Sequence, residues 1–171
     1  MPPKKRLSQS KAAVEKRKGL CLFYTHMPAW ISLSQRSHVP HTLALACRIV
    51  LAQRDITNLT VDAIVNAANE KLQRGGGVCG SIFQAAGPRM DTACATISGC
   101  ATGEAVLTEA FDIHNIKAII HAVGPRVNGP LTEEHRQQLA SSYRSSLDVC
   151  VQHGLTSIVC YFFFKGDGCA L

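Results

Sequence analysis

The sequence has no apolar run approaching the roughly 20 residues that an α-helix needs to cross a bilayer. It also shows no secretory signal at its start. These two absences predict an intracellular protein, nuclear or cytoplasmic, and argue against a membrane-spanning or secreted one.

Acidic residues are nearly missing from the first 54 positions, where Glu15 is the single acid beside ten lysines and arginines. The remaining residues carry eight lysines and arginines against eleven acids, so the formal net charge of +6 comes from a basic arm. A domain that grips nucleic acid carries its positive charge on its folded part. Nucleic acid is therefore not an expected partner of the folded domain.

The cysteines show none of the C-x-x-C pairs or histidine spacings of a zinc site. Most of the eight lie inside apolar stretches, which is typical of reduced, buried thiols in an intracellular protein. We therefore expect no metal and no cofactor.

Two regions follow from the charge pattern: a basic, largely irregular extension over residues 1–45 and one domain over residues 46–171. Within the extension, residues 4–6 (Lys-Lys-Arg) and 16–18 (Lys-Arg-Lys) resemble a two-part nuclear-import signal. A solvated basic tail and a mitochondrial presequence are the alternatives.

The most informative stretch runs from Val61 to Gly87. It begins with the near-continuous apolar strand pattern Val-Asp-Ala-Ile-Val-Asn-Ala-Ala-Asn, which is typical of a strand covered on both faces. A glycine-rich loop follows, and from Val78 the apolar residues recur at helical spacing. Glycines between a strand end and a helix start let backbone amides converge on a phosphate.

Two familiar phosphate motifs fit this stretch poorly. Gly75, Gly77 and Gly80 satisfy G-x-G-x-x-G, but five residues separate the strand from the first glycine, and no acid follows at the expected distance. No Gly-Lys-Ser/Thr follows, which excludes a P-loop. A glycine-rich loop without a ligand is the remaining alternative.

Strands alternate with helices along the rest of the chain, which predicts an α/β layered fold with a mixed or mostly parallel sheet. Thr132 is positioned to cap the longest helix, whose inward face we expect to include Leu139, Tyr143, Leu147 and Cys150. The expected strands cover residues 49–53, 105–109, 117–123 and 155–164, and the expected helices cover residues 78–86, 89–98 and 133–153.

Five ordered motifs between about residues 48 and 160 resemble those of the macrodomain family, which binds ADP-ribose. The motifs are Asp55-Ile56-Thr57, the Val61 to Asn69 strand, the Gly75 to Gly87 loop and helix, Gly99 to Ala105, and Ile120 to Pro125. They are most similar to the hydrolytic branch of the family. The resemblance implies a three-layer fold with a mixed central sheet.

The resemblance also implies roles for particular residues. Asp55 would accept a hydrogen bond from the adenine amino group, and Asn69 would bond the distal ribose, with Asn66 as its neighbour. Helix-terminal amides would hold the diphosphate without a cationic side chain. The implied ligand-binding residues are Asp55, Ile56, Asn66, Asn69, Gly76, Gly77, Val78, Cys79, Gly80, Ser81 and Ile82; Asn69 and Cys79 are the implied catalytic pair.

The chain departs from the family pattern at several points. Arg54 replaces a glycine before the aspartate, and Cys79 and Phe83 stand where hydrolytic relatives carry Asp and His. After Cys160 the family continues with a second phosphate loop, Ser-Thr-Gly-Ile-Tyr-Gly, whereas this chain reads Tyr-Phe-Phe-Phe-Lys and resembles a macrodomain truncated at its C-terminal part. We expect residues 158–164 to form an exposed, aggregation-prone edge strand.

Three functions follow from the resemblance. The first is binding of ADP-ribose or of mono-ADP-ribosylated protein. The second is hydrolysis, which removes ADP-ribose from acidic side chains or deacetylates O-acetyl-ADP-ribose, and position 79 separates it from the first. The third is a non-functional truncated remnant.

Other polar residues are predicted to be structural. His121 lies in an apolar strand and is expected to be a core histidine with its hydrogen bonds satisfied. Cys94 and Cys100 are expected to pack in the interior, and residues 133–134 (Glu-Glu) are expected to form a solvated first turn.

Overall fold

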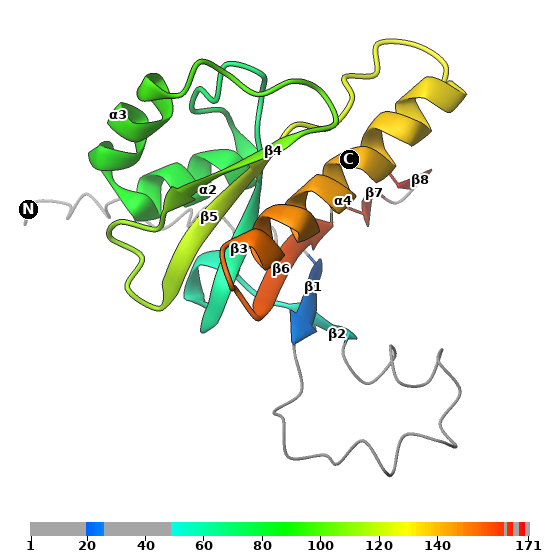
Figure 1. Cartoon of the computed structure of the whole chain (residues 1–171). Helices are drawn as coiled ribbons and strands as arrows, with labels where there is room; N and C mark the ends of the chain where they lie inside the picture. Colours follow the sequence, from blue (N-terminus) through cyan, green and yellow to red (C-terminus); the bar gives the residue numbers. More distant parts are fainter. Residues whose placement is uncertain (1–19, 26–48, 163, 166–167, 170–171) are drawn as a thin grey trace, which may run out of the picture.

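The computed structural model describes residues 20–25, 49–162, 164–165 and 168–169 (Figure 1). The expected import signal lies outside these residues. None of the helices in the described ranges combines the length and the apolar character that a bilayer crossing requires. In chain order the elements are β1 (Leu20–Thr25), β2 (Ile49–Gln53), the 3-10 helix η2 (Ile56–Asn58), β3 (Val61–Ala67), α2 (Gly77–Ala86), α3 (Pro88–Thr96), β4 (Ala105–Glu109), β5 (Ile116–Ala122), α4 (Glu133–Gln152), β6 (Ser157–Phe162), β7 (Phe164–Lys165) and β8 (Gly168–Cys169).

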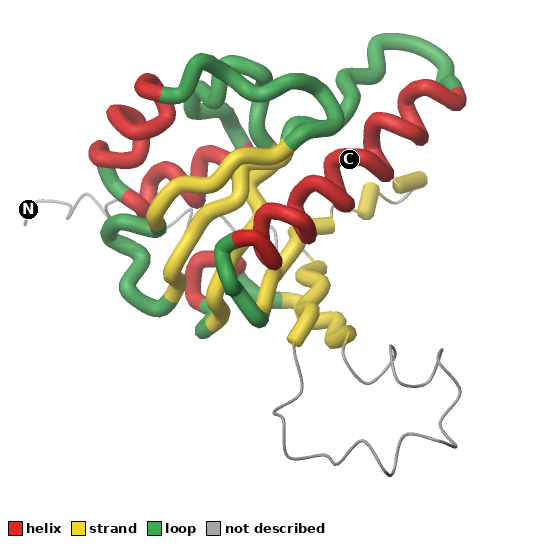
Figure 2. Tube along the Cα trace, in the orientation of Figure 1, coloured by secondary structure: helices red, strands yellow, loops and turns green. Residues whose placement is uncertain are grey.

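Six strands form one mixed sheet in the order β2-β1-β6-β3-β5-β4. β3 runs parallel to β5 and β6, whereas β4 is antiparallel to β5. Helices α2 and α3 pack on one face of the sheet and α4 packs on the other, as the two views show (Figures 1 and 2). The predicted α/β class with a mixed central sheet is confirmed.

β3 is apolar along its length because both of its faces are covered. Ile64 is fully buried in the cluster beneath α2 and α3, and Ala63 is fully buried in the cluster beneath α4. Burying one side chain of the size of Ile64 stabilises the fold by about 1.5–3 kcal/mol. The strand therefore holds the two outer layers together and fixes where its carboxyl end lies.

Asp62 anchors the start of β3 to both parallel neighbours. Its carboxylate lies 2.7 Å from Lys117 Nζ on β5, and it accepts a 2.7 Å hydrogen bond from the Thr156 amide just before β6. The hydrogen bond from Lys117 is the main reason that the pKa of Asp62 lies well below its usual range. The one charged residue of this apolar strand is therefore a structural residue.

The helix predicted after the glycine-rich loop is confirmed as α2. Gly87 ends it by donating its amide to the Phe83 carbonyl at 3.1 Å, and α3 begins at Pro88, a residue suited to a first helical turn. Met90 and Cys94 are buried as predicted. These two helices cover the face of the sheet next to the glycine loop.

The long helix α4 begins as predicted, because Thr132 Oγ1 accepts a hydrogen bond from the His135 amide at 3.3 Å. The predicted inward face is wrong at Leu147, which is 43% exposed. At 100° per residue, Leu147 lies well to one side of the stripe through Ser142, Ser146 and Cys150, and these are the buried residues. Small side chains thus let α4 lie close to the sheet.

The prediction of an exposed strand edge at residues 158–164 is wrong for β6. β6 lies between β3 and β1, and its whole length pairs antiparallel with β1. β1 comes from the extension that the sequence predicted to be largely irregular. A segment from early in the chain thus fills the position next to β6.

Candidate functional site

The glycine loop and the start of α2 form the first part of the site. Gly76 is the N-cap residue and provides no side-chain cap, and Gly77 takes a left-handed conformation with φ of 59°. Helix geometry leaves the amides of Gly77, Val78 and Cys79 without intrahelical acceptors, whereas Gly80 donates to the Gly76 carbonyl at 3.3 Å. The unpartnered amides and the helix dipole together suit an anion.

The thiol of Cys79 braces this loop. Cys79 is buried, and its Sγ lies 3.4 Å from the Gly75 amide that donates to it. The side chain is therefore turned toward the loop backbone. A thiol is a weak hydrogen-bond acceptor.

Asn69 lies just after β3, and its carboxamide shapes the turn that follows. Asn69 Oδ1 accepts hydrogen bonds from the amides of Lys71 and Gln73, both at 3.1 Å. Its Nδ2 donates to the Gln73 carbonyl at 3.0 Å. The side chain is exposed, and one Nδ2 hydrogen is not used in the turn. Asn69 therefore both shapes the turn and retains one hydrogen-bond donor for a ligand.

Asp55 and Ile56 form a third part of the site, near the entry to β3. Asp55 caps η2: its Oδ1 accepts from the Thr57 amide at 3.1 Å and from the Thr57 hydroxyl at 2.7 Å. Ile56 is buried in the core, and η2 contacts α2. The fold thus brings the Asp55 segment and the glycine loop to the same side of the sheet.

Asn66 is a predicted site residue whose polar carboxamide lies inside the core. It is fully buried, and its Nδ2 lies 3.1 Å from Nδ1 of His121 on β5. That contact assigns the ring proton to Nε2, which lies 2.9 Å from Thr108 Oγ1. Asn66 Oδ1 has no hydrogen-bond partner. His121 is confirmed as a buried core histidine, and Phe83 packs against its ring edge-on with centroids 6.3 Å apart.

Between about pH 7 and pH 5, the free energy of unfolding is expected to fall by about 2 kcal/mol because of His121. Burial lowers the pKa of His121 from 6.5 to about 4. In the unfolded chain His121 is therefore protonated below pH 6.5, whereas in the folded chain it stays neutral until the pH falls to about 4. The free energy of unfolding declines as the pH falls from 6.5 to 4. Well above pH 6.5 His121 is neutral in both states and does not make stability depend on pH.

Urea titrations across the window measure this effect, and His121→Gln is the control because it removes the titrating ring. The variant is expected to lose this part of the pH slope, whatever its absolute stability. Equal slopes in the two proteins would contradict the assignment.

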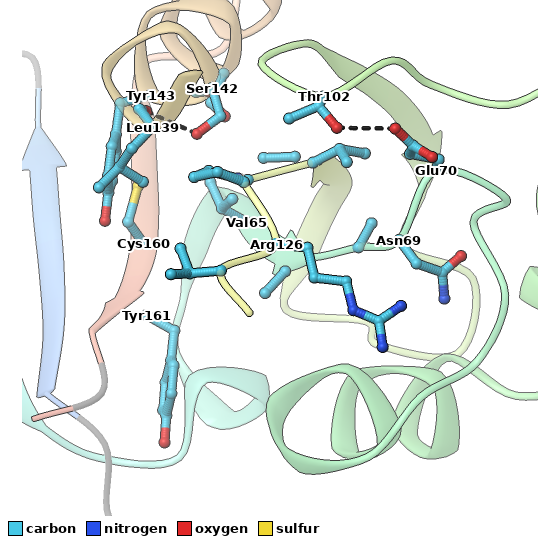
Figure 3. A pocket seen from close by; sticks show the side chains of 18 of the residues that line it. Val65, Asn69, Glu70, Thr102, Arg126, Leu139, Ser142, Tyr143, Cys160 and Tyr161 are labelled. Carbon is cyan, nitrogen blue, oxygen red and sulfur yellow. Dashed lines mark hydrogen bonds between the residues drawn. The ribbon is translucent and has the colours of Figure 1, made fainter. Parts of the chain in front are cut away.

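A pocket of about 690 Å³ opens at the carboxyl ends of β3, β5 and β6, on the face that α4 covers (Figure 3). Val65, Leu139 and Tyr143 contribute an apolar wall, and the Thr102 hydroxyl donates to Glu70 Oε1 at 2.8 Å. Of the predicted site residues, the pocket includes Asn69 alone. The sequence did not predict this pocket, because only the topology brings its separate segments together.

A sequence model described as Macro domain matches residues 65–163, more than half of the chain. The chain belongs to this family. The ADP-ribose glycohydrolase MACROD2 of Xenopus laevis is 43% identical over 115 residues, which is 67% of this chain and 27% of that protein. The chain thus spans about a quarter of the length of this relative.

Solved structures of macrodomains are also similar to this chain. The Oceanobacillus iheyensis macrodomain with ADP matches with a TM-score of 0.57 and 35% identity, over 63% of this chain and 58% of that one. The Trypanosoma brucei macrodomain in complex with ADP-ribose matches with a TM-score of 0.53 and 40% identity, over 59% of this chain and 40% of that one.

Proposed function

We propose that this chain binds ADP-ribose, free or attached to a protein, through its macrodomain. The observation that carries the proposal is the uncapped first turn of α2, which follows the carboxyl end of β3 within a fold shared with ADP-ribose-bound macrodomains. In this proposal the diphosphate lies against the amides of Gly77, Val78 and Cys79, a choice supported by the helix dipole. Adenine lies toward Asp55, and the distal ribose lies toward Asn69.

Replacing Asp55 by Ala is expected to weaken ADP-ribose binding by about 1–3 kcal/mol, the range for a hydrogen bond to a charged group. Calorimetric titration with ADP-ribose measures the loss. Asp148→Ala is a matched control, because Asp148 is exposed on α4, away from the site, and should leave the affinity unchanged. Because Asp55 also caps η2, a thermal melt must show that the variant is folded. Equal affinities in a folded variant and the wild type would remove this role for Asp55.

Hydrolysis of an ADP-ribosyl ester is the second candidate, because the relatives named above include a glycohydrolase. It requires a group that aligns or deprotonates a water beside the distal ribose. The residue at the position implied for this role is Cys79, whose thiol is buried and accepts a hydrogen bond from the Gly75 amide. The geometry therefore favours binding over turnover.

Turnover of a mono-ADP-ribosylated protein by the wild type is expected to stay near the uncatalysed background. Cys79→Asp, which supplies a carboxylate in place of the thiol, is the variant expected to gain activity. Asn69→Ala should be no faster than the wild type. Release of ADP-ribose, measured over time, compares the three proteins. Robust wild-type turnover that neither substitution changes would contradict these roles.

A further inference from the structure

The pocket on the α4 face begins where the proposed ligand ends. It includes Asn69, the residue nearest the distal ribose in the proposed function, but it includes neither Asp55 nor the glycine loop from Gly75 to Ile82. A ligand whose phosphates lie at α2 therefore does not place them in this pocket. The part of the ligand that can enter the pocket is the group attached to the distal ribose.

The two charged side chains that line the pocket differ in whether they already have a partner. Its lining contains one acid, Glu70, and one cation, Arg126. Glu70 accepts a hydrogen bond from Thr102, whereas Arg126 makes no ion pair with any described residue. Arg126 and Asn69 lie on the same side of the pocket, away from the end formed by Ser142 and Tyr143 (Figure 3). A guanidinium placed in this way favours a carboxylate, which it can hold with two hydrogen bonds.

We propose that this pocket receives the protein segment that carries the ADP-ribosyl group, and that Arg126 pairs with an acidic side chain next to the modified residue. This inference rests on the proposed binding of ADP-ribose. The volume of about 690 Å³ exceeds what one side chain fills, and Val65, Leu139 and Tyr143 supply apolar surface for the rest of the segment. The preferred ligands are therefore acidic, mono-ADP-ribosylated peptides.

Two synthetic mono-ADP-ribosylated peptides, differing only by Glu or Gln beside the modified residue, test the role of Arg126. The wild type is expected to bind the Glu peptide about two- to five-fold more tightly, the range for an ion pair at an accessible surface. Arg126→Ala should bind both peptides equally, and Arg126→Glu should reverse the preference. The wild-type preference should shrink as salt is raised.

Gly124 offers a test of the pocket itself. It lines the pocket, and a Cβ added to it would meet nothing within 4 Å, so Gly124→Leu introduces bulk without a backbone clash. This variant is expected to lose affinity for both peptides at least two-fold. Gly129→Leu is the matched control, because its added Cβ also meets nothing within 4 Å and Gly129 does not line the pocket.

Free ADP-ribose separates this inference from the function on which it rests. The affinity for ADP-ribose should be the same in the wild type and in all four variants. If the wild type binds ADP-ribose but shows the same peptide preference as Arg126→Ala, the inference fails and the proposed function stands. If a pocket variant weakens free ADP-ribose as much as it weakens the peptides, the inference also fails. If the wild type binds neither ADP-ribose nor peptide, the proposed function fails and takes the inference with it.

Discussion

Replacing Gly80 by Ala is expected to weaken ADP-ribose binding at least about ten-fold, which corresponds to about 1.4 kcal/mol. A Cβ at this position would lie 2.7 Å from the carbonyl oxygen of Gly75, closer than a carbon and an oxygen normally pack. The obstacle is backbone, so the loop must move. Movement of the loop also displaces the first amides of α2, which are the groups proposed to hold the diphosphate. Calorimetric titration with ADP-ribose measures the effect.

Gly76→Ala is the control for this prediction. A Cβ at Gly76 meets nothing within 4 Å, and its φ of −89° suits any residue, so binding should match the wild type. Gly80→Glu should bind more weakly than Gly80→Ala, because it adds bulk and a negative charge beside a diphosphate. Alanine favours a helix over glycine by up to about 1 kcal/mol, so any thermal destabilisation by Gly80→Ala would reflect the clash. Unchanged affinity in Gly80→Ala would show that these amides do not hold the ligand.

Replacing Leu22 by Pro is expected to cost about 1–3 kcal/mol of folding free energy, the range for leaving a paired backbone group without its partner. Leu22 lies in the middle of β1, opposite Leu51 of β2 on one side and Cys160 of β6 on the other. A proline in an interior strand removes a ladder hydrogen bond and its ring obstructs the neighbouring strand. Urea unfolding followed by circular dichroism measures the loss.

Leu22→Val provides the comparison, because it keeps the backbone amide and suits a strand. This variant should remain close to the wild type in stability. If Leu22→Pro and Leu22→Val unfold at the same urea concentration, β1 contributes no pairing to the sheet.

The elements that the sequence predicted correctly are those whose local pattern agrees with their surroundings. β3 reads as an apolar run because both of its faces are buried, and the change to helical spacing at Val78 marks the start of α2 within one residue. Thr132 predicted the start of α4 because capping is decided within one turn. The burial pattern of a strand and the cap of a helix depend on residues that are close in the sequence, so patterns in a single sequence predict them.

The missed features depend on register and topology. Asn66 and His121 are bonded because the parallel register of β3 and β5 places them opposite each other. The buried face of α4 contains Ser142 and Ser146, which no hydrophobic pattern predicts as core. β1 forms because partners far along the chain accept it, and the pocket exists because β3, β5 and α4 converge. Such pairings depend on the rest of the fold, so they cannot be predicted from a local stretch of sequence.

The place of β1 between β2 and β6 has a consequence for the order in which the chain folds as it is synthesised. β1 and β2 are synthesised before the other strands and can pair with each other, but β6, which pairs with the other side of β1, is synthesised only after α4. Until then β1 and β3 each present an open edge, and contacts between such distant segments form slowly. The nascent chain therefore exposes two unpaired strand edges until β6 is made, and β6 then completes the sheet by inserting between β1 and β3.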